Sequence, residues 1–199
     1  LEMSNTLQAV RHWVFDMDGT LTLAIHDFER IRRELDIPPA DDILQHLDAL
    51  PMDEAAAKHA WLLAHEQQLA LSAQAAPGAV QLVRSLAQRG CRLGILTRNA
   101  HALAQLTLEV IGLEDYFAPD DIIGRDEAAP KPDPGGLLHL AQRWQVAPTE
   151  LVMVGDFCFD LQCARAVGAT SVLVNLPENP WPQLTDVHAR DCHELLSLL

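Results

Sequence analysis

The sequence predicts an α/β protein with a doubly wound parallel sheet and a small all-helical subdomain inserted near its start. From residue 79 onward, short apolar runs alternate with amphipathic stretches, which is the pattern of strand–helix repeats. Residues 24–76 contain no apolar β-branched run and are rich in Ala, Leu, Asp, Glu and His, which favours helices alone. We therefore divide the 199-residue chain into a core of residues 1–21 and 77–199 and an insertion of residues 22–76.

The expected elements follow in order along the chain. Trp13, Val14 and Phe15 form an apolar run typical of a buried strand. In the insertion, helices are expected over residues 27–35, 40–50 and 53–73. In the rest of the core, strands are expected over residues 91–97, 121–124, 151–154 and 171–174, and helices over residues 80–88, 101–112, 134–145 and 161–167. Residues 184–199 favour an edge segment followed by a terminal helix.

The long helix of the insertion has a predicted buried face. Trp61, Ala64, Gln68 and Leu71 recur at helical spacing and are expected to share that face. The face is widened by Leu62, Leu69 and Ala73. We expect Trp61 to pack between the helices of the insertion.

The acidic composition disfavours some classes of partner. The chain carries 14 Lys or Arg residues against 28 Asp or Glu residues, a net charge of −14, which disfavours binding to nucleic acid or to an anionic membrane. No apolar run reaches the ~18–20 residues of a membrane span. The first residues lack the basic start and apolar block of a signal peptide. The four cysteines form no CxxC pair and are expected to be free thiols, which makes a cytoplasmic location the default.

Two carboxylates follow the first apolar run. Asp16 and Asp18 are spaced i, i+2, so their side chains point to the same side of an extended segment. Burying a charged carboxylate costs several kcal/mol unless it is paired or bound to a metal. Because open α/β sheets bind ligands at the carboxyl ends of their strands, the sequence predicts a functional site here.

Four stretches carry a resemblance to a known family. Residues 16–21, Asp-Met-Asp-Gly-Thr-Leu, resemble motif I of the haloacid dehalogenase (HAD) superfamily. Thr97 at a strand end, Lys131 before a proline, and Asp156 with Asp160 in Gly-Asp-x-x-x-Asp resemble motifs II, III and IV, in family order. The chain is similar to the branch of phosphoglycolate phosphatase and β-phosphoglucomutase, in which a helical cap follows motif I. The resemblance implies a Rossmann-like core, a cap and Mg²⁺ as cofactor.

The resemblance also implies a role for each matched residue. Asp16 would act as the nucleophile and form an aspartyl-phosphate, and Asp18 would serve as general acid and base. Lys131 would screen the negative charge of Asp16 and of the phosphate. The ligands of Mg²⁺ would be Asp16, the backbone carbonyl of Asp18, and Asp156. Asp160 would orient Lys131 or a metal-bound water.

Other residues are candidates for phosphate or substrate binding. The Thr97 hydroxyl, with neighbouring backbone N–H groups such as that of Asn99, would hold the phosphoryl oxygens. Two interpretations of Arg98 stay open, contact with substrate or phosphate and exposure to solvent. In the insertion, His26 and Arg30 lie closest in sequence to the first strand and are our first candidates for substrate contacts.

The expected function is a Mg²⁺-dependent phosphatase that acts on a small phosphorylated metabolite, as a monomer or homodimer. The alternatives are a sugar phosphomutase, a phosphonatase that uses Lys58 for Schiff-base chemistry, and a non-catalytic binding protein of the same fold. Asp18 argues against a haloacid dehalogenase, which needs no second catalytic aspartate. Hinges for cap motion are expected near residues 21–23 and 76–78, and Gly78→Pro is expected to depress turnover while leaving the fold near normal.

Overall fold

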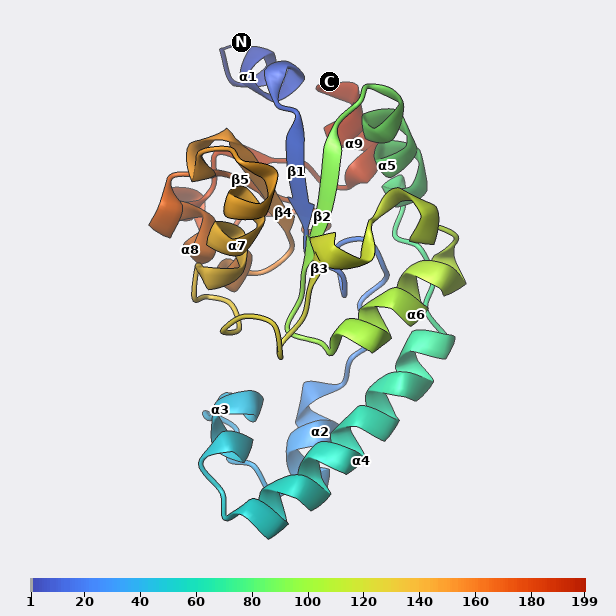
Figure 1. Cartoon of the computed structure of the whole chain (residues 1–199), viewed down its shortest axis with the longest axis vertical. Coiled ribbons are helices and arrows are strands. Elements are labelled where there is room, and N and C mark those ends of the chain that lie inside the picture. The colour runs from blue at the N-terminus through green and yellow to red at the C-terminus, as the bar shows by residue number, and fades with distance from the viewer. Residues whose placement is uncertain (1) are drawn as a thin grey trace.

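The computed structural model describes the backbone of residues 2–199 and the side chains from residue 6 onward. Its centre is a six-stranded, all-parallel sheet with the strand order β3-β2-β1-β4-β5-β6 (Figure 1). The strands are β1 (His12–Phe15), β2 (Arg92–Leu96), β3 (Ile122–Ile123), β4 (Leu151–Gly155), β5 (Thr170–Leu173) and β6 (Val187–His188). This order confirms the predicted doubly wound α/β class.

Helices cover both faces of the sheet because successive side chains of a buried strand point to opposite sides. Trp13 and Phe15 of β1 pack in one apolar cluster with α5 (Ala79–Gln88), α6 (His101–Ile111) and α9 (Cys192–Ser197). Val14 lies in a second cluster with α7 (Gly135–Trp144) and α8 (Cys158–Val167). Figure 1 shows these two helical layers on either side of the strands.

The insertion folds into three helices beyond the carboxyl ends of the strands (Figure 1). They are α2 (Phe28–Glu34), α3 (Ile43–Asp48) and α4 (Met52–Leu71), with an apolar cluster of their own that includes Ile31, Leu47 and Leu62. α2 and α3 begin at the aspartates Asp27 and Asp42, whose side chains accept backbone N–H groups of the first turn. The last part of α4 packs against α6 of the core.

The predicted buried face of α4 is wrong at most positions, although Leu62 is buried and Trp61 packs against the apolar cluster of the insertion, as expected. Leu71 is 60% exposed, Ala64 and Gln68 are also exposed, and Trp61 is only partly buried. The buried side chains of this helix are Leu62, Glu66 and Ala70, which recur every four residues. Because the middle residue of this buried stripe is a glutamate, counting apolar residues did not identify the stripe.

The two linkers of the insertion are paired with each other. Thr22 and Ala75 form an antiparallel bridge, and backbone hydrogen bonds join Leu23 N to Gln74 O (2.9 Å) and Ala76 N to Leu21 O (2.8 Å). The expected outcome of Gly78→Pro therefore needs correction. Gly78 has φ +80° and lies so close to the backbone of α9 that even a Cβ would collide with it, so proline there would damage the core itself.

Several elements differ from expectation at their ends. The helix α1 (Glu2–Ala9) was not expected. The helix expected over residues 40–50 begins only at Ile43, and the helix expected from residue 161 begins at Cys158. The terminal region gives the short edge strand β6 and then α9, as expected. Single 3₁₀ turns lie at Glu114–Tyr116, Pro119–Asp121, Pro148–Glu150 and Pro182–Leu184.

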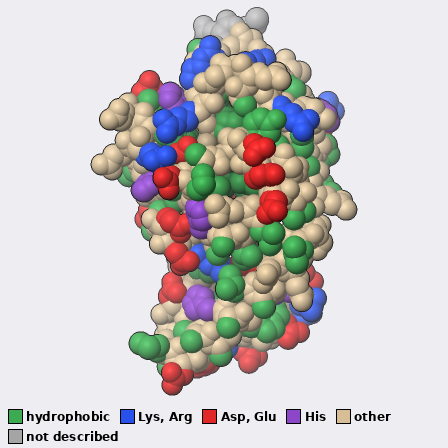
Figure 2. All heavy atoms as spheres, turned by 45° about the vertical axis from the view of Figure 1, so that its right-hand side comes forward, with side chains coloured by type: hydrophobic (Ala, Val, Ile, Leu, Met, Phe, Trp, Pro, Cys, Tyr) green, Lys and Arg blue, Asp and Glu red, His purple; other side chains and the backbone are tan. Residues whose placement is uncertain are grey.

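The surface agrees with the acidic composition. On the face formed by α4, α5 and α6, acidic side chains occur along the length of the molecule (Figure 2). Basic and hydrophobic side chains lie between them. Among the helices of the described chain, none has the length and hydropathy that crossing a membrane requires.

Candidate active site

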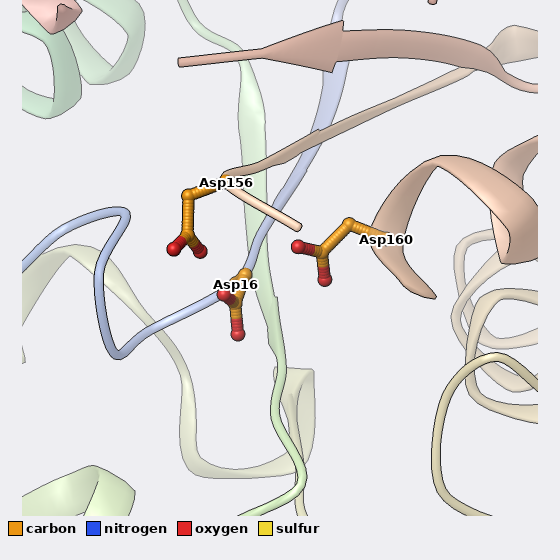
Figure 3. A group of neighbouring side chains, drawn as sticks. All are labelled: Asp16, Asp156 and Asp160. Carbon is orange, nitrogen blue, oxygen red and sulfur yellow. The ribbon is translucent and has the colours of Figure 1, made fainter. Parts of the chain in front are cut away.

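The carboxyl ends of the central strands bring the motif residues together. Asp16 follows β1, Thr97 follows β2 and Asp156 follows β4, and these three strands are neighbours in the sheet. Asp16 N still donates to Val154 O (2.9 Å), so the nucleophile candidate is fixed to the end of β4. Figure 3 shows the carboxylates of Asp156 and Asp160 extending towards Asp16. One carboxylate oxygen from each of these three residues lies within 4.8 Å of the others.

Lys131 is buried beside this acidic group. Its Nζ donates to Asp16 Oδ1 (2.9 Å), to Asp160 Oδ1 (2.8 Å) and to the backbone oxygen of Leu96 (2.7 Å). Burial opposes the charge on Lys131, but the carboxylates of Asp16 and Asp160 outweigh it and raise the lysine pKa. The lysine therefore stays protonated and holds both carboxylates in place.

The acidic group holds more negative charge than one lysine neutralises. Burial, followed by the charge of Asp16, raises the pKa of Asp156 to about 9. Burial and Asp16 also raise the pKa of Asp160 to about 6, although Lys131 opposes the shift. Clustered carboxylate oxygens are the donors that a hard divalent cation prefers, so these residues fit the Mg²⁺ that the sequence implies. The cluster contains the Asp160 side chain and not that of Asp18, whose expected contribution is a backbone carbonyl.

Asp18 lines the same cavity as Asp16 and has a raised pKa. Burial raises its pKa, His26 opposes that shift, and the charge of Asp16 adds to it. The Asn99 side chain also opposes the shift. A carboxyl group with a raised pKa next to the nucleophile candidate is suited to donate a proton.

Sequence reasoning missed the residues that shape the loop after Asp16. The Thr20 hydroxyl donates to Asp156 Oδ1 (3.0 Å) and Asp16 Oδ2 (3.3 Å), and so ties the two carboxylates together. Asn175 Nδ2 donates to the backbone oxygens of Gly19 (2.8 Å) and Thr20 (3.0 Å). Thr20 lies within the first motif and could have been found there, whereas nothing in the sequence relates Asn175 to this loop.

A cavity of about 560 Å³ lies between the sheet edge and the insertion. Its wall contains most of the residues that the sequence singles out, namely Asp16, Asp18, His26, Thr97, Arg98, Asn99, Lys131, Asp156 and Asp160. Thr97 is buried and its hydroxyl accepts the N–H of Asn99 (3.1 Å), which fixes the loop after β2. Arg30 is exposed on α2 and does not line the cavity. Lys58 is also outside the wall and pairs with Glu54 (3.5 Å).

Arg98 joins the insertion to the core. Its guanidinium pairs with Asp42 at the start of α3, donates to the backbone oxygen of Lys131, and stacks over the ring of Phe159 at 5.1 Å. Arg98 also lines the cavity, so its contact with substrate or phosphate stays a prediction, whereas simple exposure to solvent does not describe this arrangement. The partner Asp42 is 56 residues away, so no local pattern relates the two residues.

A second ion pair joins α4 of the insertion to the loop that follows β3 in the core. Arg125 Nη1 donates to both carboxylate oxygens of Glu66, at 3.0 and 3.3 Å. The side chains of Arg125 and Glu66 are 11% and 7% exposed, so the pair is largely removed from water. No local pattern predicts this pair, because Glu66 lies within a long helix and Arg125 is 59 residues away.

Comparison with known proteins agrees with the site. The model of the haloacid dehalogenase-like hydrolases matches residues 10–168. An uncharacterized hydrolase of Saccharomyces cerevisiae is 31% identical over 97% of this chain and 94% of its own. A phosphoglycolate phosphatase of Nitrosospira multiformis is 32% identical over 83% of this chain and 67% of its own.

Solved structures share the fold. A hydrolase from Pseudomonas syringae superposes with a TM-score of 0.76 at 22% identity, over 94% of this chain and 96% of that one. At this identity the likeness supports the fold, while the sequence matches carry the family assignment. The motif residues that the sequence predicts to form one site do lie around one cavity. The chain belongs to the haloacid dehalogenase-like hydrolases and is an enzyme of that family.

Proposed function

We propose that the enzyme is a Mg²⁺-dependent phosphatase that hydrolyses a small phosphate monoester through an aspartyl-phosphate on Asp16. The observation that carries this proposal is the buried Lys131, whose Nζ holds Asp16 and Asp160 next to Asp156 in the cavity wall. Among the relatives, the one from Nitrosospira multiformis is named a phosphoglycolate phosphatase, which supports a phosphate ester as the substrate class.

Asp16 and Asp18 divide the chemistry between them. A carboxylate oxygen of Asp16 attacks phosphorus, and the bond between phosphorus and the leaving oxygen breaks. Asp18 gives its proton to that leaving oxygen, so the product departs as an alcohol. Asp18 then takes a proton from a water that attacks the phosphorus of the aspartyl-phosphate, which releases inorganic phosphate and restores the Asp16 carboxylate and the protonated Asp18 carboxyl group.

Other residues hold the phosphoryl group during this exchange. The Thr97 hydroxyl and the backbone N–H groups of the following residues would contact phosphoryl oxygens. Lys131 keeps its proton and screens the charge of Asp16 as the two anions approach each other. Mg²⁺, held by Asp16, Asp156 and the backbone carbonyl of Asp18, would supply further charge neutralisation of the phosphoryl group.

The insertion acts as a cap in this proposal. We keep residues 22–76 as the cap and residues 1–21 and 77–199 as the core, with His26 as a substrate contact because it lines the cavity. Arg30 has no such support. The paired linkers at Thr22 and Ala75 are the place where a hinge would act.

A sugar phosphomutase remains the second candidate, because a cavity of about 560 Å³ can hold an acceptor hydroxyl in place of the attacking water. Lys58 pairs with Glu54 outside the cavity wall, so the geometry offers no support for a phosphonatase. The four cysteines are free thiols, which fits the cytoplasmic location that we propose. We expect a small metabolite as the ligand and a monomer or homodimer as the assembly.

Phosphate release tests the proposal. A panel of phosphate monoesters, phosphoglycolate and sugar phosphates included, is incubated with wild type and Asp16→Asn, with Mg²⁺ or with EDTA. We expect turnover that needs both Mg²⁺ and Asp16, with a loss of at least about 10³-fold in Asp16→Asn. Asp115→Asn, an exposed aspartate outside the cavity wall, is the control and should match wild type. Release that persists in EDTA or in Asp16→Asn would contradict the proposal.

A further inference from the structure

The cations that line the cavity are already engaged by the protein. Arg125 is paired with Glu66, and Arg98 with Asp42 and the backbone oxygen of Lys131. Arg32 donates through Nε and Nη2 to the backbone oxygen of Asp41, both at 3.3 Å. Lys131 is held by the carboxylates of the catalytic site. Within the described residues, these are the Lys and Arg side chains of the cavity wall.

The remaining basic group of the wall is His26, which lowers the pKa of both Asp18 and Glu66. Its ring stacks on Phe28 with centroids 5.4 Å apart. Carboxylates outnumber the cations in the wall as a whole. A substrate with a second anionic group would therefore be repelled by the excess of carboxylates, and Arg98 and Arg125 are already paired with two of them.

The cap contributes several apolar side chains to the cavity wall. Phe28 and Ile31 of α2, Ile43 and Leu44 of α3, and Leu62 of α4 contribute to it from the cap, and Phe159 contributes from the core. Burying an apolar group against these side chains is favourable, whereas burying an unpaired charged group there is unfavourable.

Recruiting one of the paired arginines would be costly. An anionic group of the substrate that paired with Arg125 would leave the buried Glu66 carboxylate without its cation. Breaking a buried ion pair by removing one partner is strongly unfavourable. An anion that took Arg98 would displace Asp42 from the cap and disturb the carbonyl of Lys131. Both ion pairs thus act against a second anionic group on the substrate.

We propose that the physiological substrate is a phosphate monoester with an uncharged, largely apolar leaving group, and that the Glu66–Arg125 and Asp42–Arg98 pairs exclude leaving groups that carry a second negative charge. This inference rests on the proposed phosphatase function and adds the substrate class and the residues that select it.

Three probes separate charge from size. Benzyl phosphate, 4-carbamoylbenzyl phosphate and 4-carboxybenzyl phosphate share the same type of leaving oxygen, and the last two have nearly the same shape. We expect kcat/KM of wild type to be about tenfold or more higher for the carboxamide than for the carboxylate. Benzyl phosphate should be at least as good a substrate as the carboxamide.

Variants test whether the Glu66–Arg125 pair is responsible. In Glu66→Gln, Arg125 keeps a hydrogen-bond partner but loses its counter-charge, so the carboxamide-to-carboxylate ratio should fall towards one. Glu54→Gln lies on the same helix and outside the cavity wall, and should keep the wild-type ratio. A general loss of stability would lower both rates alike and leave the ratio unchanged.

The possible failures are distinct. A wild-type ratio of one or less would overturn the substrate class, and an unchanged ratio in Glu66→Gln would overturn the assignment to this ion pair. If wild type releases phosphate from none of the three probes nor from the monoester panel, the proposed function fails and this inference fails with it.

Discussion

Gly19 is the residue on which the geometry of the acidic group depends most closely. It has φ +83°, and a Cβ at this position would collide with the carboxylate of Asp156. We expect Gly19→Ala to reduce kcat at least about tenfold, because Asp156 must move, and to lower the free energy of unfolding by more than about 1 kcal/mol. Phosphate-release kinetics and urea unfolding measure the two effects.

Gly90 is the matched control for that substitution. Its φ of +78° is nearly the same, yet a Cβ there would meet no atom within 4 Å. Gly90→Ala should therefore show only the strain of the left-handed conformation, about 1 kcal/mol, and should retain wild-type kcat. Equal losses of activity in the two variants would show that the contact with Asp156 is irrelevant.

His65 makes stability depend on pH. Burial lowers the pKa of His65 below its usual value, Arg30 and His26 lower it further, and its buried Nε2 has no hydrogen-bond partner among the described residues. Because the folded-state pKa lies below the unfolded value, the stabilisation is present above about pH 6.5 and is lost as the pH falls below it. The fold therefore favours neutral His65.

Chemical unfolding of wild type and His65→Gln at about pH 7.5 and about pH 5.5 measures this effect. We expect wild type to lose more stability on acidification than His65→Gln does. His139→Gln, which changes an exposed histidine of α7, should behave as wild type. If His65→Gln and wild type lose the same stability, His65 is not linked to folding.

At the scale of elements, the starts of α2 and α3 differ in one respect. Asp27 and Asp42 both cap their helices, but Asp42 also pairs with Arg98 of the core. We expect Asp27→Ala to cost about 1 kcal/mol from the lost cap. Asp42→Ala should cost about 2 kcal/mol, since a partly buried ion pair is lost as well. Urea unfolding measures both, and equal costs would show that the pair with Arg98 adds no stability.

The central strands and most helices were predictable because their patterns are local. The apolar run Trp13–Phe15 became β1, and the stretch before Gly168 became α8. The buried face of α4 was not predictable from hydrophobicity, because the middle position of its inner stripe is Glu66, whose burial depends on Arg125. The start of α8 was missed because its first turn is fixed by Asp160, whose Oδ2 accepts the N–H of Phe157 (3.2 Å).

At the scale of the whole molecule, the site is a meeting of distant segments. It was possible to predict from the sequence that Asp16, Thr97, Lys131 and Asp156 meet at one edge, because parallel strands end on the same side of a sheet. The contacts between cap and core could not be predicted, because they depend on how the two parts pack together. Arg98 shows this difference most clearly, since its sequence neighbours indicate a phosphate loop and its side chain contacts the cap.

The measurement that most directly tests the account is the trapping of the phosphoryl group on Asp16. Wild type is mixed with a monoester that it hydrolyses, quenched in acid within the first turnover, digested and examined by mass spectrometry. The account predicts one phosphoryl group on the peptide that contains Asp16, and none on that peptide from Asp16→Asn. Rapid phosphate release with no phosphorylated peptide, or with the phosphoryl group on another residue, would contradict it.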